Sequence, residues 1–531
     1  MTAYGCWLAE PADSGCKQKV TRMLKQLGRV LGNFIQERRG NVAILFAFSL
    51  IPLLLATGVA VDYGRAMMVR DRMADAADSA ALAIGSWPGL TQAQMTTKAQ
   101  QFFDANYPPS TLGTVGTVSV SFSGNDITAT VSGTVKTTFM GIANILGANI
   151  DHIDVGASST ITKQQGKIEL ALVLDNTGSM AGTKIANLKS AASNLVDQLA
   201  ATAQGADADA VRLSLVPYTM TVNVGPTNKG AAWLTGVMPT AYGTDIFTTA
   251  GTDRFKMLSQ MGVSWGGCVE ARPSPYDVTE SPPSSGGTLY VPYFAPDEPD
   301  TSYGGYVNNY LTDVSVDQNK SWQIQQGDPA KYNKAPKTGT TSLGYQFGPN
   351  SGCEIQPLTR LTNSFSGFKA AINSMTAGGD TDIKAGLMWG WHTLSPNPPF
   401  ADGVTYGKVG YTKIMILMTD GQNHNVVLSD NDQSAYSDIG YIWQGRLGII
   451  SGSLSQRISV LDQKLAQACA NAKTAGVVIY TVVIDDPTVD QSTIKNCASS
   501  SDKLFDVSDS SGLDAAFSNI AGSIQNLRIA K

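Results

Sequence analysis

One apolar stretch, Asn41 to Val61, places the strongest constraint on how this chain can fold. Its sequence, NVAILFAFSLIPLLLATGVAV, contains 21 residues and no charged side chain. A helix of that length spans a hydrocarbon layer of about 30 Å. A buried helix of a soluble protein and a cleaved signal peptide are the alternatives, but the long polar arm before the stretch is unusual for a signal peptide. We therefore predict a retained transmembrane helix over residues 41–61.

Basic residues flank this stretch unequally, and that bias predicts its orientation. Lys and Arg concentrate on the cytoplasmic side of membrane helices. Residues 1–40 therefore form a cytoplasmic basic arm, and the bulk of the chain lies on the other side of a membrane that it crosses once. The basic residues before the stretch are Lys17, Lys19, Arg22, Lys25, Arg29, Arg38 and Arg39, and those in the 20 residues after it are Arg65, Arg70 and Arg72.

The composition narrows the class of protein. Charged residues make up only 15% of the chain, and Gly accounts for 53 of 531 residues, which suits a secreted or cell-envelope protein better than a cytosolic enzyme. The net charge of −5 gives no sign of a nucleic-acid partner. The six cysteines form no CxxC pair and only three histidines occur, so we expect no zinc site.

Residues 62–165 are predicted to form a stem. The helix should continue past the membrane to about Ile84, because Asp62–Gly85 contains no Pro and is rich in Ala and Met. A shorter helix follows within TQAQMTTKAQQFFDANYP. Alternating apolar and polar residues then predict a hairpin from Thr117–Phe122 and Ile127–Val135, and a further strand over Asp154–Thr162.

From Lys167 the pattern changes to alternating strands and helices, which predicts a doubly wound α/β sheet over residues 166–531. The strand KIELALVLD is continuously apolar, as in a parallel sheet that is covered on both faces. The other predicted strands are VRLSLVPYT, KIMILMTDG and VVIYTVVID. The predicted helices lie in KIANLKSAASNLVDQLAATA, FSGFKAAINSM, SQRISVLDQKLAQACANAKTAG and GLDAAFSNIAGSIQNLRI.

Oxygen-bearing side chains stand where these strands end. Asp175 ends the first strand and is followed by Thr177 and Ser179, Asp420 ends the strand KIMILMTD, and Thr381 lies in a Gly-rich turn before a helix. Ligands of such sheets gather beyond the carboxyl ends of the strands. Five oxygen donors there predict a site for Mg²⁺, with Ca²⁺ or Mn²⁺ as alternatives. The alternatives are helix caps and turn hydroxyls, or Asp175 as a nucleophile that accepts a phosphoryl group.

These three motifs resemble the metal-ion-dependent adhesion site of von Willebrand factor A domains. The D-x-[ST]-x-S motif is matched by Asp175, Thr177 and Ser179, the threonine loop by Thr381, and the T-D-G strand end by Asp420 and its neighbours. The resemblance implies that the site holds a divalent cation with one open coordination position, which a protein partner fills with an Asp or Glu. It implies a binding protein and not an enzyme. Against an aspartyl-phosphate phosphotransferase, position 176 is Asn where that chemistry needs a lysine.

Two insertions interrupt the α/β pattern, at residues 220–364 and 423–454. The first is far longer than an ordinary loop and contains Cys268 and Cys353, so we predict an ordered subdomain that their disulfide cross-links. A flexible linker is the alternative, but the aromatic content argues against it. Cys469 and Cys497 are the second disulfide candidates.

The N-terminal segment, RRGNVAILFAFSLIPLLLATGVAVDYGRAMMVRDRMADAADSAALA, resembles the Flp (tight-adherence, Tad) pilus-assembly proteins of the TadE/TadG type. A long helix followed by a small sheet also resembles the pilin architecture. WGGCVE and SGCEIQPLT in the first insertion resemble the TadG type. The resemblance implies a single-pass protein of the bacterial inner membrane, with its bulk periplasmic or on the cell surface, that serves Flp pilus assembly and adherence with pilin-like partners. A general surface adhesin that binds host or matrix proteins is the alternative.

Overall fold

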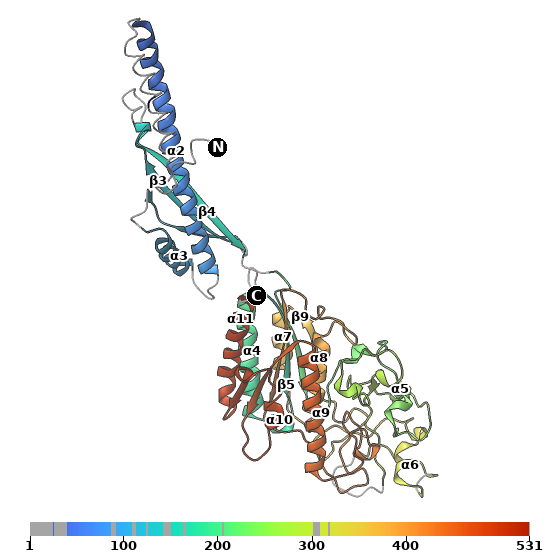
Figure 1. Ribbon diagram of the computed structural model, residues 1–531. Helices are drawn as coiled ribbons and strands as arrows, with labels where there is room; N and C mark the ends of the chain where they lie inside the picture. The colour runs from blue at the N-terminus through green and yellow to red at the C-terminus, as the bar shows by residue number, and fades with distance from the viewer. Residues whose placement is uncertain are drawn as a thin grey trace. The chain divides into compact units, whose positions relative to one another are not determined.

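The computed structural model describes residue 25 and residues 40–85, 92–108, 113–123, 126–141, 150–162, 166–203, 207–300, 308–316 and 319–529. The chain divides into two compact units, and the boundary between them in the sequence lies between Ile161 and Thr162 (Figure 1). The predicted cytoplasmic arm, apart from residues 25 and 40, lies outside the described residues, as do Cys6 and Cys16.

The first unit is built on one long helix, α2 (Gly40–Gly85), which continues from the apolar stretch as predicted. A second helix, α3 (Gln92–Asn106), packs against it. The sheet consists of β1 (Thr114–Val115), β2 (Ser119–Ser123), β3 (Asp126–Lys136) and β4 (His152–Thr162), with β3 paired to each of the other three. Figure 1 shows this sheet lying along the second half of α2.

Small side chains let the sheet approach α2 closely. The buried residues of the helix recur every three or four positions, so they lie along one face of it. This face consists of Ala66, Val69, Met73, Ala76, Ala77, Ala80, Ala81 and Ile84. The side chains between Ile44 and Val61 are mostly exposed, as a lipid-facing segment requires. Within the described residues, α2 alone is long and apolar enough to cross a membrane.

Asp62 ties the stem sheet to α2 at the point where the apolar stretch ends. Its buried carboxylate accepts hydrogen bonds from the backbone N–H groups of Thr138, Phe139 and Met140, at 3.1, 2.7 and 2.7 Å. These residues lie shortly after β3, which ends at Lys136. One carboxylate therefore holds the end of the sheet against the helix.

The second unit contains a six-stranded sheet in the order β12–β11–β10–β5–β6–β9. The strands are β5 (Lys167–Asp175), β6 (Val211–Tyr218), β9 (Thr359–Thr362), β10 (Tyr411–Thr419), β11 (Val477–Ile484) and β12 (Leu504–Val507). All neighbours pair in parallel except β6 and β9, which are antiparallel. The predicted mixed α/β class is confirmed.

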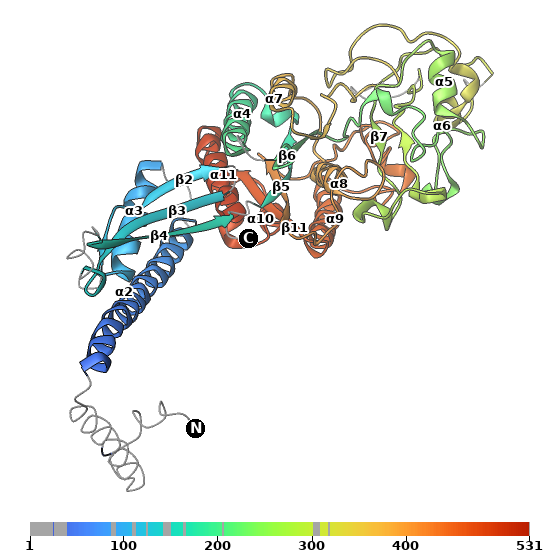
Figure 2. The same cartoon turned by 90° about the horizontal axis from the view of Figure 1, so that it is seen from above.

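Helices cover both faces of this sheet, as Figure 2 shows. On one face, Leu170, Leu172 and Leu174 of β5 pack against α4 (Thr183–Ala203), α7 (Phe365–Asn373) and α11 (Leu513–Ile529). On the other face, Ala171 and Val173 pack against α8 (Ile383–Leu394) and α9 (Leu454–Thr474). Alternate residues of one strand therefore serve two separate cores.

The long insertion has a packed core but little regular structure. Its elements are α5 (Arg254–Gln260), α6 (Trp322–Gly327) and the short pair β7 (Val269–Glu270) and β8 (Val291–Pro292). Aromatic side chains fill its interior, and this interior is continuous with the core under α8. The described parts of the insertion therefore pack around a core that they share with the α/β unit.

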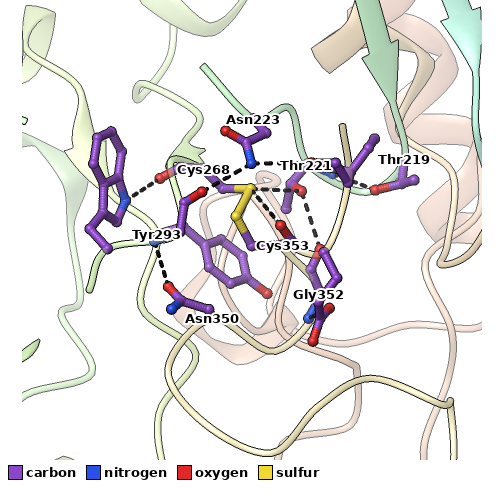
Figure 3. The surroundings of a disulfide bond; sticks show 12 residues. Thr219, Thr221, Asn223, Cys268, Tyr293, Asn350, Gly352 and Cys353 are labelled. Atoms are coloured by element: carbon purple, nitrogen blue, oxygen red, sulfur yellow. Dashed lines mark hydrogen bonds between the residues drawn. A yellow bond between two sulfur atoms is a disulfide. The ribbon is translucent and has the colours of Figure 1, made fainter. Parts of the chain in front are cut away.

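Both predicted disulfides are present. Cys268 and Cys353 are joined with their Cα atoms 5.9 Å apart. Figure 3 shows the chain after β6 running past this bond, where Asn223 donates to the carbonyls of Gly266 and Ile355. Cys469 of α9 is bonded to Cys497, which follows the short helix α10 (Ser492–Lys495). The first disulfide thus joins two distant parts of the insertion, and the second joins two neighbouring elements of the α/β unit.

Candidate metal site

Three loops meet at the carboxyl ends of β5 and β10, and backbone hydrogen bonds hold them together. Gly178 donates its N–H to the carbonyl of Gly379 at 2.9 Å, and Gly378 donates to the carbonyl of Asn176 at 2.8 Å. The N–H of His424, which follows β10, donates to the carbonyl of Thr381 at 2.8 Å. The loop before α8 is therefore bonded to the loops that follow both strands.

Four of the five predicted donors form one hydrogen-bonded group. The Thr177 hydroxyl donates to Asp175 Oδ1 at 2.6 Å and lies 3.0 Å from the Ser179 hydroxyl. Ser179 in turn donates to Asp420 Oδ1 at 2.6 Å. Asp175 and Asp420 come from strands that are neighbours in the sheet, so their meeting follows directly from the strand order.

Thr381, the fifth predicted donor, lies in the adjoining loop. Its carbonyl accepts the His424 bond, and its side chain is largely buried. Among the described residues, no hydrogen bond joins the Thr381 hydroxyl to the other four donors. The backbone bonds therefore bring this loop to the site.

The two carboxylates carry like charges in a buried place. Both side chains are almost completely buried, and burial together with the charge of Asp420 raises the pKa of Asp175 to about 6. Hydrogen bonds from Thr177 and from the Thr419 hydroxyl, the latter to Asp175 Oδ2 at 2.7 Å, oppose that rise. Buried carboxylates need a cation or a proton nearby, so the electrostatics of this pair favour a positive ligand.

The donor set fits a hard divalent cation. It offers two carboxylates and three hydroxyls, which are the oxygen ligands that Mg²⁺, Ca²⁺ and Mn²⁺ prefer. In the part of the chain that the structure describes, no three His, Cys, Asp or Glu side chains cluster as a metal site. The candidate site therefore depends on its hydroxyls as well as on Asp175 and Asp420.

Sequence reasoning missed several residues around the site. Lys184, on the first turn of α4, donates to Asp420 Oδ2 at 2.6 Å. Thr419, the residue before Asp420, is a second such residue, because its hydroxyl donates to Asp175 Oδ2. The insertion also reaches the site, because a Cβ added at Gly379 would lie 2.6 Å from the Tyr345 hydroxyl. Of these residues, only Lys184 could be suspected from the sequence, because it follows closely after Ser179.

A histidine–carboxylate pair stands beside the Thr381 loop. His424 Nδ1 lies 2.5 Å from Asp380 Oδ1, and this hydrogen bond raises the pKa of the imidazole against the opposing effect of partial burial. The N–H of Val426 donates to the other oxygen of Asp380 at 2.9 Å. Asp380 thus holds the chain after β10 next to the loop that carries Thr381.

Several solved structures of pilus and adhesin proteins are similar to this chain at low identity. They include the pilus adhesin SpaC from Lactobacillus rhamnosus GG, with 12% identity over 77% of this chain and 33% of that one, and a TM-score of 0.28. The vWF domain of the type V pili tip protein Mfa5 from Porphyromonas gingivalis shares 12% identity over 69% of this chain and 97% of that one, with a TM-score of 0.33. The adhesive tip pilin GBS104 from Group B Streptococcus agalactiae shares 12% identity over 67% of this chain and 100% of that one, with a TM-score of 0.30. The chain spans about a third of the length of SpaC.

A family model identifies the N-terminal segment. The model described as "Putative Flp pilus-assembly TadE/G-like" matches residues 40–85, which are the residues of α2. The predicted resemblance of this segment to the TadE/TadG type is confirmed. No curated protein matches the chain. Together with the apolar helix α2, the family match indicates a membrane-anchored envelope protein in the context of Tad pili.

Proposed function

We propose that this protein serves Flp/Tad pilus assembly and adherence, and that it binds a protein partner through a metal-ion-dependent adhesion site. The observation that carries the proposal is the group of oxygens that joins Asp175, Thr177, Ser179 and Asp420 across two strands. On this proposal, the six-stranded sheet with helices on both faces is a doubly wound von Willebrand factor A domain. The family match of α2 supports the pilus context.

The proposed mechanism is reversible binding of a partner without a chemical reaction. Asp175 and Asp420 would supply two negative charges, and Thr177, Ser179 and Thr381 would supply neutral oxygens. A bound Mg²⁺ would offer a Lewis-acidic position for one further oxygen ligand. Because two carboxylates nearly neutralise a divalent charge, a third carboxylate, from a partner's Asp or Glu, is still attracted and can leave again.

The anchor and the stem would set where this site acts. The proposed order is a cytoplasmic arm (1–40), a transmembrane helix (41–61), a stem (62–165) and the metal-site domain (166–531). In this order the N-terminus would lie in the cytoplasm, and the site would lie on the other side of the bacterial inner membrane. The stem helix α2 would pack with pilin-like partners within or beside the membrane.

The proposal is tested by capture of envelope proteins on the full-length protein in detergent. We expect one partner to be retained with Mg²⁺, released by EDTA and recovered when Mg²⁺ returns. Asp175→Ala should abolish its capture, whereas Asp514→Ala, at an exposed carboxylate on α11, should not. Capture that survives both EDTA and Asp175→Ala would contradict a metal-dependent site. A captured partner that is a pilin or pilus-assembly protein would support the Tad assignment.

A further inference from the structure

Lys184 contacts a carboxylate of the candidate metal site. Its Nζ lies 2.6 Å from Asp420 Oδ2, while the other oxygen of Asp420 accepts the Ser179 hydroxyl. The Asp420 side chain is fully buried, but 39% of the Lys184 side chain is exposed. Within the described residues, this is the one ion pair that Asp175 or Asp420 makes with a basic side chain.

The partly exposed side chain of Lys184 can move away from Asp420. Lys184 lies on the first turn of α4 and its side chain is partly exposed, so solvent can receive the ammonium without a change in the helix. A second acid is within electrostatic range. Hydrogen bonds from Thr488 lower the pKa of the exposed Asp486, and the charge of Lys184 contributes to that lowering. The ammonium therefore contacts a buried carboxylate and is also attracted by an exposed one.

A divalent cation and an ammonium cannot share Asp420 Oδ2 without repulsion. Two positive charges a few ångströms apart repel each other, and the metal ion and the ammonium would both bind to the same oxygen. We infer that Lys184 is a tethered cation that competes with the divalent ion for Asp420, so that it sets the concentration at which the ion binds. This inference rests on the proposed metal site and adds a residue that tunes it.

The test is calorimetric titration of Mg²⁺ into the full-length, EDTA-stripped protein in detergent. Lys184→Met keeps most of the side-chain length and removes the charge, so we expect the Kd for Mg²⁺ to fall roughly fivefold to tenfold. Lys184→Arg keeps the charge and should stay near the wild-type Kd. Lys189→Met is the matched control, because Lys189 lies on the same helix and donates to the carbonyl of Asn373, away from the site carboxylates.

The outcomes separate the two proposals. Tighter binding by Lys184→Met alone supports competition. Binding by Lys184→Met within about twofold of wild type, or weaker, overturns the role of Lys184 and leaves the metal site standing. If neither the wild type nor any variant binds Mg²⁺, the metal site is refuted and the role of Lys184 with it. Circular dichroism of each variant checks that the fold is intact.

Discussion

Gly379 is the residue on which the geometry of the candidate site depends most. Its carbonyl accepts the N–H of Gly178, which joins the loop of Asp175 to the loop of Thr381. Its φ of +88° lies in the left-handed region that favours glycine. A Cβ at this position would also lie 2.6 Å from the Tyr345 hydroxyl and 3.4 Å from Thr219 Cβ. Both the backbone and the surroundings therefore require glycine.

We expect Gly379→Ala to weaken Mg²⁺ binding roughly tenfold, because the loop must shift away from Gly178 to relieve the strain. The measurement is the same Mg²⁺ titration. Gly378→Ala is the matched control, since a Cβ there meets nothing within 4 Å and its φ is not positive. Equal affinities for the two variants would mean that the geometry of this loop does not govern the site.

Asp62 plays a comparable role in the stem. We expect Asp62→Ala to speed hydrogen exchange at the amides of Thr138, Phe139 and Met140 by roughly 30-fold, which corresponds to about 2 kcal/mol. The physical reason is that one carboxylate accepts all three N–H groups. Asp71→Ala, at an exposed carboxylate of the same helix, should leave these amides unchanged. Unaltered exchange in Asp62→Ala would show that the loop is held by other contacts.

The residues of the candidate site divide into those that sequence could predict and those it could not. Asp175 and Asp420 were predictable, because each ends an apolar strand of a parallel sheet and such ends share one edge. The partnership of Lys184 with Asp420 was not, since it depends on the angle at which α4 leaves the loop. Nor was the contact of Tyr345 with the Thr381 loop, because the insertion has no periodic pattern that would place its side chains.

Among the elements, the two insertions share a group of buried acids, with Glu298 in the first insertion and Asp430 and Asp432 in the second. Glu298, Asp430 and Asp432 have only neutral hydrogen-bond donors, such as Tyr441, Trp443 and Gln326, and none forms an ion pair in the described part of the chain. Burial raises the pKa of Asp432 to about 8, and the charge of Asp430 adds to the rise against the donors. Burial and the other two acids raise the pKa of Glu298 as well.

This group should make the larger unit, which contains both insertions, less stable as pH rises. Folded Asp432 keeps its proton up to about pH 8, whereas an unfolded Asp loses it near pH 4. Between these values the folded state binds more protons, so the free energy of unfolding falls with increasing pH. We expect Asp432→Asn, which imitates the protonated form, to be similar to wild type at pH 5 and more stable than wild type at pH 8 by up to about 4 kcal/mol.

Urea unfolding at both pH values measures this effect. Asp514→Asn, at an exposed position on α11, should follow the wild type at each pH. A wild-type protein whose stability is the same at pH 5 and pH 8, or a variant with unchanged pH dependence, would contradict a protonated Asp432.

The regular elements follow the sequence where apolar periodicity is strong. The long helix α2 and strands β5, β6, β10 and β11 lie within a residue or two of their predicted ranges. The edge strands β9 and β12 were not predicted, because each has four residues and only partial burial, which leaves little pattern to detect. β9 also lies within the range assigned to the insertion, so the sheet takes its last strand from a segment that the sequence pattern places outside it.

The described part of the molecule consists of two units with separate cores, and the first unit contains the apolar helix α2. The stem core consists of small side chains on α2 that face a narrow sheet, and the larger unit has one core on each face of its own sheet. Each unit therefore has the buried interior that a domain needs. The candidate site belongs to the larger unit alone, since every residue of the site lies after Thr162.

The most direct test of this account is a count of bound ions on the full-length protein, with Mn²⁺ followed by electron paramagnetic resonance. The account predicts one Mn²⁺ per chain, displaced by Mg²⁺, with affinity reduced roughly a hundredfold or more in both Asp175→Asn and Asp420→Asn. Wild-type protein that binds no Mn²⁺, or variants that bind it as tightly as wild type, would contradict it.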